Sequence, residues 1–136
     1  VLRVDVKNIE RVLSKNIIPV IAPLAVDVSG GIGLNINADL AAAAIAGAYP
    51  GSTLIIMTDV EGIYRNWPEQ NSVISEISAQ ELKELVTTFS GGMLPKVQAA
   101  LEAIQAGANS VRIIDGTSDL SFEQALSGEG GTLVFA

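Results

Sequence analysis

The order of apolar and polar positions along the chain predicts alternating strands and helices. Short, nearly continuous apolar runs predict buried strands, and these runs lie at residues 17–23, 53–58, 110–114 and 131–135. Alternation at Leu2, Val4 and Val6 predicts a further strand. A short extended segment is expected at residues 73–77. Helices are expected at residues 8–15, 40–49, 78–86, 93–106 and 119–126.

Strands that alternate with helices are typical of parallel βαβ units. We therefore expect one α/β domain over residues 1–136, a three-layer sandwich with a mainly parallel sheet flanked by helices. Sheets of this kind bind ligands beyond the carboxyl ends of their strands. The segments that follow the predicted strands, and the turns that open the helices, are therefore the places to search for chemistry.

Composition narrows the functional classes. Hydrophobic residues make up 49% of the 136 residues and charged residues 17%, enough apolar material for a packed core. The formal charge of −7 disfavours nucleic acid as a partner, because phosphate backbones are repelled. No apolar run approaches the roughly 20 residues that cross a bilayer, so no membrane partner is expected. The lack of cysteine favours a cytoplasmic location.

The missing residue types exclude several kinds of site. Without histidine or cysteine there is no Ser-His-Asp triad, no cysteine nucleophile and no usual zinc site. The common phosphate-loop and dinucleotide-binding motifs are also missing. The remaining lysines, carboxylates and glycines suit phosphoryl transfer, in which the protein mainly positions groups and neutralises charge.

Three polar amide and carboxylate side chains lie between a glycine-rich turn at 29–33 and a predicted helix: Asn35, Asn37 and Asp39. Asparagine and aspartate are preferred helix N-caps, so capping alone explains one of them. The other two would remain free to orient a ligand or a lysine.

A second polar cluster, Thr58-Asp59-Val60-Glu61-Gly62, follows the apolar strand at 53–58. Turn chemistry alone accounts for an aspartate and a glycine there. At the ligand-binding edge of the sheet, Asp59 and the nearby backbone would instead contact a nucleotide.

A third motif, Ser90-Gly91-Gly92-Met93-Leu94-Pro95-Lys96, opens the strongest predicted helix. Two glycines let backbone amides approach a phosphate, and the helix dipole favours the anion. Lys96 in the first turn is unfavourable with that dipole, by about 0.3–1 kcal/mol, so we expect a compensating partner such as a polyphosphate. The alternative is a solvated surface lysine.

In this order and spacing the motifs resemble the amino acid kinase family, and the similarity covers essentially the whole chain. Asn-Ala-Asp at 37–39 and Thr-Asp-Val at 58–60 are shared widely in the family. The combination of Gly91-Gly92-Met93-Leu94-Pro95-Lys96 with Ile113-Ile114-Asp115-Gly116 is similar to the members that phosphorylate N-acetylglutamate. Residues 18–24 and Gly130-Gly131-Thr132 also fit that group.

The resemblance implies transfer of the ATP γ-phosphoryl group to the side-chain carboxylate of N-acetyl-L-glutamate, a step of arginine biosynthesis. It implies Lys96 and Asp39 as catalytic residues and Asn35 and Asn37 as substrate-binding residues. Mg²⁺ would travel with the ATP, held mostly by phosphate and water oxygens rather than by a protein metal site. The implied nucleotide-binding residues are Thr58, Asp59, Val60, Gly62, Ile63, Tyr64, Thr88, Phe89, Ser90, Gly92, Met93 and Lys96.

The family also carries, in an N-terminal half, a lysine, a glycine-rich turn and a substrate-binding arginine that this sequence lacks. Residues 1–136 are therefore expected to be an ATP-binding C-terminal domain that is inactive alone. Its expected partners are ATP or ADP and N-acetylglutamate, with a homo-oligomer left open. The alternatives are another member of the family, a non-catalytic nucleotide-binding module, and a structural α/β domain whose motifs are only caps and turns.

Overall fold

The computed structural model describes residues 1, 3–29 and 31–136. Its main sheet has the strand order β3-β5-β6-β4. Strand β3 (Thr53–Thr58) lies parallel to β5 (Ser110–Asp115), and β4 (Glu76–Ser78) lies parallel to β6 (Thr132–Phe135). Only the central pair, β5 and β6, is antiparallel. The predicted α/β fold with a mainly parallel sheet is confirmed.

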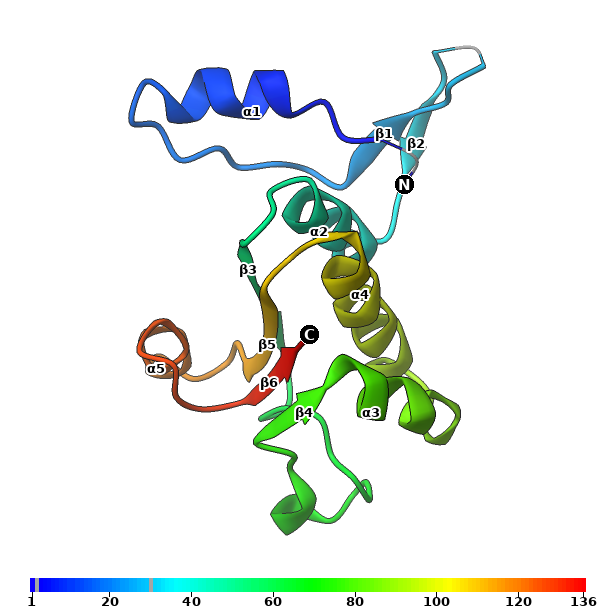
Figure 1. Cartoon of the computed structure of the whole chain (residues 1–136), viewed down its shortest axis with the longest axis vertical. Coiled ribbons are helices and arrows are strands. Elements are labelled where there is room, and N and C mark those ends of the chain that lie inside the picture. The colour runs from blue at the N-terminus through cyan, green and yellow to red at the C-terminus, as the bar shows by residue number, and fades with distance from the viewer. Residues whose placement is uncertain (2, 30) are drawn as a thin grey trace.

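Helices cover both faces of this sheet (Figure 1). Helices α2 (Ala38–Gly47), α3 (Ala79–Leu85) and α4 (Met93–Ala106) lie on one face, and α5 (Ser121–Leu126) lies on the other. Two short 3₁₀ helices, η1 (Gln70–Ser72) and η2 (Val86–Thr88), complete the connections. The longest described helix has 14 residues, and none of the described helices is long and apolar enough to cross a membrane.

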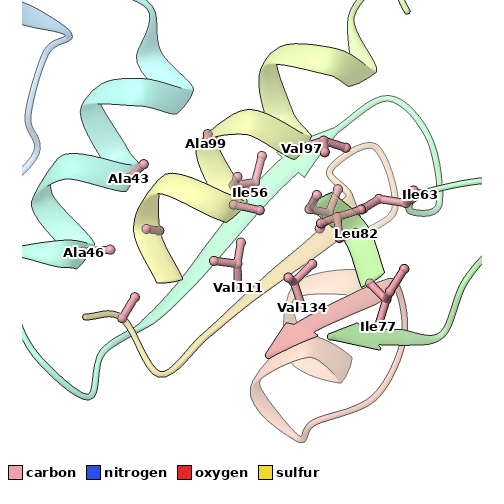
Figure 2. Packing of buried hydrophobic residues seen from close by; sticks show 14 of the residues in the cluster. Ala43, Ala46, Ile56, Ile63, Ile77, Leu82, Val97, Ala99, Val111 and Val134 are labelled. Atoms are coloured by element: carbon pink, nitrogen blue, oxygen red, sulfur yellow. The ribbon is translucent and has the colours of Figure 1, made fainter. Parts of the chain in front are cut away.

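The core lies between the sheet and the α2–α4 layer (Figure 2). Val111 and Ile113 of β5 meet Val97 of α4 there, and all three are fully buried. Alanines on the facing surfaces of α2 and α4 let the two helices pack closely. A methyl group on Gly47 would overlap that of Ala106, so only glycine permits this approach at the carboxyl ends of the two helices.

The first residues do not form the predicted strand at 2–6. Residues 3–5 form no strand, and Val6 already begins helix α1 (Val6–Leu13). Asp5 caps this helix, because its carboxylate accepts a hydrogen bond from the Lys7 amide at 3.2 Å. The capped helix forms here in place of the strand that the alternating pattern predicts. Leu2, the first residue of that pattern, lies outside the described residues.

The predicted buried strand at 17–23 is also wrong. The segment has no strand partner, and Ile18 and Val20 are 86% and 97% exposed. Strand pairing occurs later, where β1 (Leu24–Val26) lies antiparallel to β2 (Gly33–Asn35). The sequence pattern identified residues that prefer to be buried, but among the described residues the neighbouring elements only line an open groove beside them and leave most of the segment exposed. Of the predicted turn at 29–33, Gly30 lies outside the described residues.

Candidate functional site

The first turns of α2 and α4 lie side by side and bring together two residues 57 positions apart. Lys96 Nζ donates a hydrogen bond to Asp39 Oδ2 at 3.0 Å and forms an ion pair with it. The two side chains are 19% and 21% exposed, so the pair is largely sheltered but keeps partial access to solvent. A partly sheltered ion pair is screened less by water than a surface pair.

The start of α4 has the form of an anion-binding site. Gly92 is its N-cap, and no side chain caps the helix there. A methyl group on Gly91 or Gly92 would meet nothing within 4 Å, so the backbone faces open space. The first amides of a helix have no partner within the helix and carry partial positive charge. A phosphate group could therefore approach these amides and the Lys96 ammonium together.

The ion pair also answers the electrostatic problem posed by the sequence. A lysine in the first turn of α4 opposes the helix dipole, and the Asp39 carboxylate compensates it. Asp39 itself lies in the first turn of α2, where a negative charge is favoured. The carboxylate therefore fixes the direction of the ammonium group.

The two asparagines of the first motif have different surroundings. Asn37 caps α2, and its Oδ1 accepts a hydrogen bond from the Leu40 amide at 3.1 Å. Asn35 lies in β2, where its backbone is in register with Leu24 and its side chain is exposed. The structure thus uses the Asn37 carbonyl locally and leaves Asn35 accessible.

The second motif lies at the carboxyl end of β3, next to the end of β5. Thr58 Oγ1 donates to Asp59 Oδ1 at 3.1 Å, and the Gly116 amide donates to the Thr58 carbonyl at 2.7 Å. Asp59 is exposed and Val60 is half-buried. Asp59 is thus accessible at the edge of the sheet where parallel strands generally bind ligands.

The next three predicted contacts are part of the packed interior. A methyl group on Gly62 would lie 2.6 Å from Thr132 Oγ1, and the Ile63 side chain is fully buried. Tyr64 is 8% exposed and packs edge-to-face on Trp67, with ring centroids 5.0 Å apart. The backbone of Ile63 is also engaged, because its amide donates to Thr132 Oγ1 at 2.8 Å and its carbonyl accepts from the Ile74 amide at 2.8 Å.

The segment before α4 is more open. Thr88 and Ser90 are exposed, and Thr88 Oγ1 donates to the Leu85 carbonyl at 2.7 Å. Phe89 and Met93 are half-buried against the core. These residues precede α4 or lie in its first turn, as Gly92 and Lys96 do.

Sequence reasoning missed a small pocket at the carboxyl end of β5. The pocket has a volume of about 320 Å³, and Asp115, Glu61 and Ser121 are among its lining residues. Thr117 donates two hydrogen bonds to the Asp115 carboxylate, which hold the pKa of that carboxyl below its usual value. Its lining residues are scattered along the chain, and in the sequence Asp115 entered only as part of a motif that resembles the family.

A larger groove of about 1120 Å³ lies between the N-terminal segment and α2. Apolar side chains dominate it, including Ile18, Val20 and Leu40, and Asn37 also lines it.

Among the described residues no three histidine, cysteine, aspartate or glutamate side chains gather as metal ligands. The groups that the start of α4 offers to an anionic ligand are the Lys96 ammonium and the helix amides.

Comparison with known proteins places these features in a family. The profile described as "Amino acid kinase family" matches residues 1–115. The acetylglutamate kinase of Mycobacterium sp. (strain KMS) is 42% identical over 113 residues, which cover 83% of this chain. The chain spans only 39% of the length of that relative.

Solved structures give the same picture. N-acetylglutamate synthase from Neisseria gonorrhoeae, complexed with coenzyme A and L-arginine, superposes with a TM-score of 0.85 at 26% identity, over 96% of this chain and 30% of that one. Carbamate kinase from Giardia lamblia bound to AMP-PNP gives a TM-score of 0.67 at 28% identity, over 82% of this chain and 40% of that one.

Proposed function

The chain belongs to the amino acid kinase family, and from that premise we propose that it is the ATP-binding part of an acetylglutamate kinase. The reaction is transfer of the ATP γ-phosphoryl group to the side-chain carboxylate of N-acetyl-L-glutamate. The observation that carries the proposal is the Lys96–Asp39 pair beside the uncapped start of α4. Sequence identity of 42% over 113 residues to a kinase of that name supports the choice of acceptor.

Lys96 has the central role in the proposed mechanism. In phosphoryl transfer an acceptor oxygen bonds to the γ-phosphorus while the bond to the ADP oxygen breaks, and negative charge passes to the leaving group. The Lys96 ammonium stabilises that charge, and Asp39 holds the ammonium in one direction. The amides at the start of α4 bind the phosphates. Mg²⁺ would arrive with the nucleotide, held by its phosphates and by water rather than by protein ligands, and would supply further positive charge to the phosphates.

The remaining predicted residues take supporting roles. Asn35 is the proposed contact for the acylated amino acid, because its exposed side chain is free to bind. The exposed or half-buried residues proposed to line the nucleotide site are Thr58, Asp59, Val60, Thr88, Phe89, Ser90, Gly92 and Met93, whereas Gly62, Ile63 and Tyr64 are buried and are proposed to shape the site from the interior. The AMP-PNP complex of the Giardia carbamate kinase supports nucleotide binding by this fold.

We propose that residues 1–136 act as a nucleotide-binding domain that works together with a separate substrate-binding domain. The relatives are long enough to contain such a second domain, because this chain spans only 39% of the length of the Mycobacterium kinase. The isolated chain is then expected to bind nucleotide and to turn over little substrate, because half of a positioned charge clamp contributes only part of its rate enhancement. Turnover at the rate of a complete kinase would contradict this division.

The test is calorimetric titration of the 136-residue chain with MgADP. The parent should bind, and Lys96→Ala should weaken binding about 10- to 100-fold, because a charged hydrogen-bond donor to phosphate is lost. Lys83→Ala, an exposed lysine on α3, is the matched control and should leave binding unchanged. Equal loss in both variants, or no binding by the folded parent, would contradict the proposed site.

A second candidate is a module of the same fold that does not transfer phosphate. The similarity to N-acetylglutamate synthase favours it, since that chain carries this fold under a name that is not a kinase. Such a module need not bind MgADP through Lys96, so the same titration separates the two candidates.

A further inference from the structure

Asn37 is the N-cap of α2, a role different from the substrate binding that the family resemblance implies for it. Its amide oxygen accepts the Leu40 N–H at 3.1 Å and thereby caps α2. The backbone at Asn37 is extended, with φ −61° and ψ 130°, as an N-cap requires. The carbonyl that would recognise a substrate donor is therefore already engaged with the helix.

The cap lies two residues before Asp39, in the same helical turn. An N-cap hydrogen bond fixes the backbone of the first turn, where otherwise the amides are unpaired and the end frays. The Asp39 carboxylate projects from this turn and accepts the Lys96 ammonium at 3.0 Å. The position of Lys96 therefore depends on how firmly the start of α2 is held.

The two neighbouring helix starts are built differently. Helix α2 has a side-chain cap and an acidic residue in its first turn, whereas α4 begins at Gly92 without a side-chain cap. At their other ends the helices meet at Gly47 and Ala106, where a methyl group on the glycine would not fit. Helix α2 is thus a fixed support, and the start of α4 remains open for the ligand.

From these contacts we infer that Asn37 is a positioning residue that acts through Asp39 to hold the Lys96 ammonium at the start of α4. The inference rests on the proposed function for the identity of the ligand. The two hydrogen bonds that connect these residues, from the Leu40 amide to Asn37 and from Lys96 to Asp39, are present in the chain whatever its ligand is. Residues that keep an N-cap oxygen should replace asparagine here, whereas a substrate ligand would need the amide.

The first test needs no nucleotide. Trace acetylation with acetic anhydride, read by mass spectrometry, reports the reactivity of each lysine of the 136-residue chain. Asn37→Ala should raise the Lys96 rate about two- to fivefold, the factor equivalent to a lost N-cap. Asn37→Ser keeps the cap and should restore the parent rate. Asp39→Asn gives the upper limit, and Lys7, Lys15 and Lys83 serve as internal references.

The second test uses MgADP affinity in a double-mutant cycle. Asn37→Ala should weaken binding up to about fivefold in the parent and have no further effect in a Lys96→Ala background. Circular dichroism checks that each variant is folded.

Each result decides the inference. An unchanged Lys96 rate in Asn37→Ala overturns it, and so does a Ser variant that behaves like Ala. If the parent does not bind MgADP while acetylation follows the expected pattern, the proposed function fails and the positioning role of Asn37 stands.

Discussion

Single side chains join distant parts of this fold through hydrogen bonds that the sequence does not mark. The Thr132 hydroxyl is fully buried, accepts from the Ile63 amide at 2.8 Å and donates to the Ile74 carbonyl at 2.6 Å. It therefore satisfies two backbone groups in the buried interior. Gly62 is required beside it, because a methyl group there would lie 2.6 Å from the same hydroxyl oxygen.

Replacing this hydroxyl should be costly. Thr132→Val keeps the shape but leaves the Ile63 N–H and the Ile74 carbonyl without partners, so we expect a loss of about 2–4 kcal/mol in the free energy of unfolding. Urea denaturation measures it. Thr132→Ser retains the hydroxyl and should be the milder change, and a valine variant as stable as the serine variant would contradict this bridge.

The two proposed catalytic residues show what a sequence pattern does not predict. Asp39 and Lys96 could each be identified from helix-start chemistry, and Lys96 from its conflict with the helix dipole. Their pairing depends on α2 and α4 lying parallel with adjacent first turns. Local chemistry cannot specify that arrangement.

Helix ends carry most of the local information at the scale of elements. In α3 the Ser78 hydroxyl and amide donate to Glu81 Oε2 at 2.7 and 3.2 Å, and the Glu81 amide donates back to Ser78 Oγ at 3.2 Å. This is the capping box expected from Ser78 and Glu81 in the sequence. Its hydrogen bonds also lower the pKa of the Glu81 carboxyl below the usual 4.5.

The capping box should make stability depend on pH. Because the folded pKa of Glu81 is depressed, its contribution is present above the unfolded value of 4.5 and is lost as pH falls through the folded pKa. Glu81→Gln keeps an acceptor in the box but does not titrate. The difference in unfolding free energy between parent and Glu81→Gln should therefore shrink from pH 7 towards pH 3.

Glu84→Gln is the matched control for this experiment, because it removes the same charge from α3 outside the capping box. Denaturation curves collected at several pH values compare the two variants. The same pH profile for both would show that net charge, rather than the capping box, causes the effect.

The open start of α4 leads to a prediction about binding alone. Gly92 has φ −68°, and an added methyl group meets nothing within 4 Å, so Gly92→Ala should change the free energy of unfolding by less than about 1 kcal/mol. The same methyl group stands where a phosphate would approach the helix amides, so MgADP affinity should fall. Calorimetry measures the affinity.

Gly33→Ala on β2 also adds a methyl group in open space and serves as the control. It should alter neither stability nor affinity. If Gly92→Ala binds MgADP as tightly as Gly33→Ala does, the phosphates do not lie at the start of α4.

The whole molecule divides into a packed layered part and an N-terminal part rich in exposed apolar side chains (Figure 1). The buried core draws on residues from α2 onward, and among the described residues none of its members precedes Ala43. Ile18, Val20, Leu24 and Val28 are each more than two-thirds exposed. Stability should therefore come mainly from the layered part.

Two isoleucines test this division. Ile113→Ala, at a fully buried position, should cost about 2–5 kcal/mol of unfolding free energy, because it removes buried methylene groups and leaves a cavity. Ile18→Ala, at a position 86% exposed, should stay within about 0.5 kcal/mol. Urea denaturation of both variants measures the contrast, and similar losses would mean that residues 17–22 are buried in solution.

The sequence by itself determined the α/β class, the helices from Asn37 onward, the strands β3, β5 and β6, and the motif residues Asp39 and Lys96. These features follow from local periodicity and from cap and turn chemistry, which act within a few residues. The alternating strand and helix pattern also implied parallel pairing, and the sheet is mainly parallel.

Only the tertiary structure decided how those pieces are used. The Lys96–Asp39 ion pair, the antiparallel pairing of β5 with β6 and the burial of Ile63 and Tyr64 all depend on segments far apart in sequence. The apolar run at 17–23 was predicted to be a buried strand and is an exposed segment instead. A sequence pattern records what a segment prefers to bury, whereas burial itself requires another surface to pack against it.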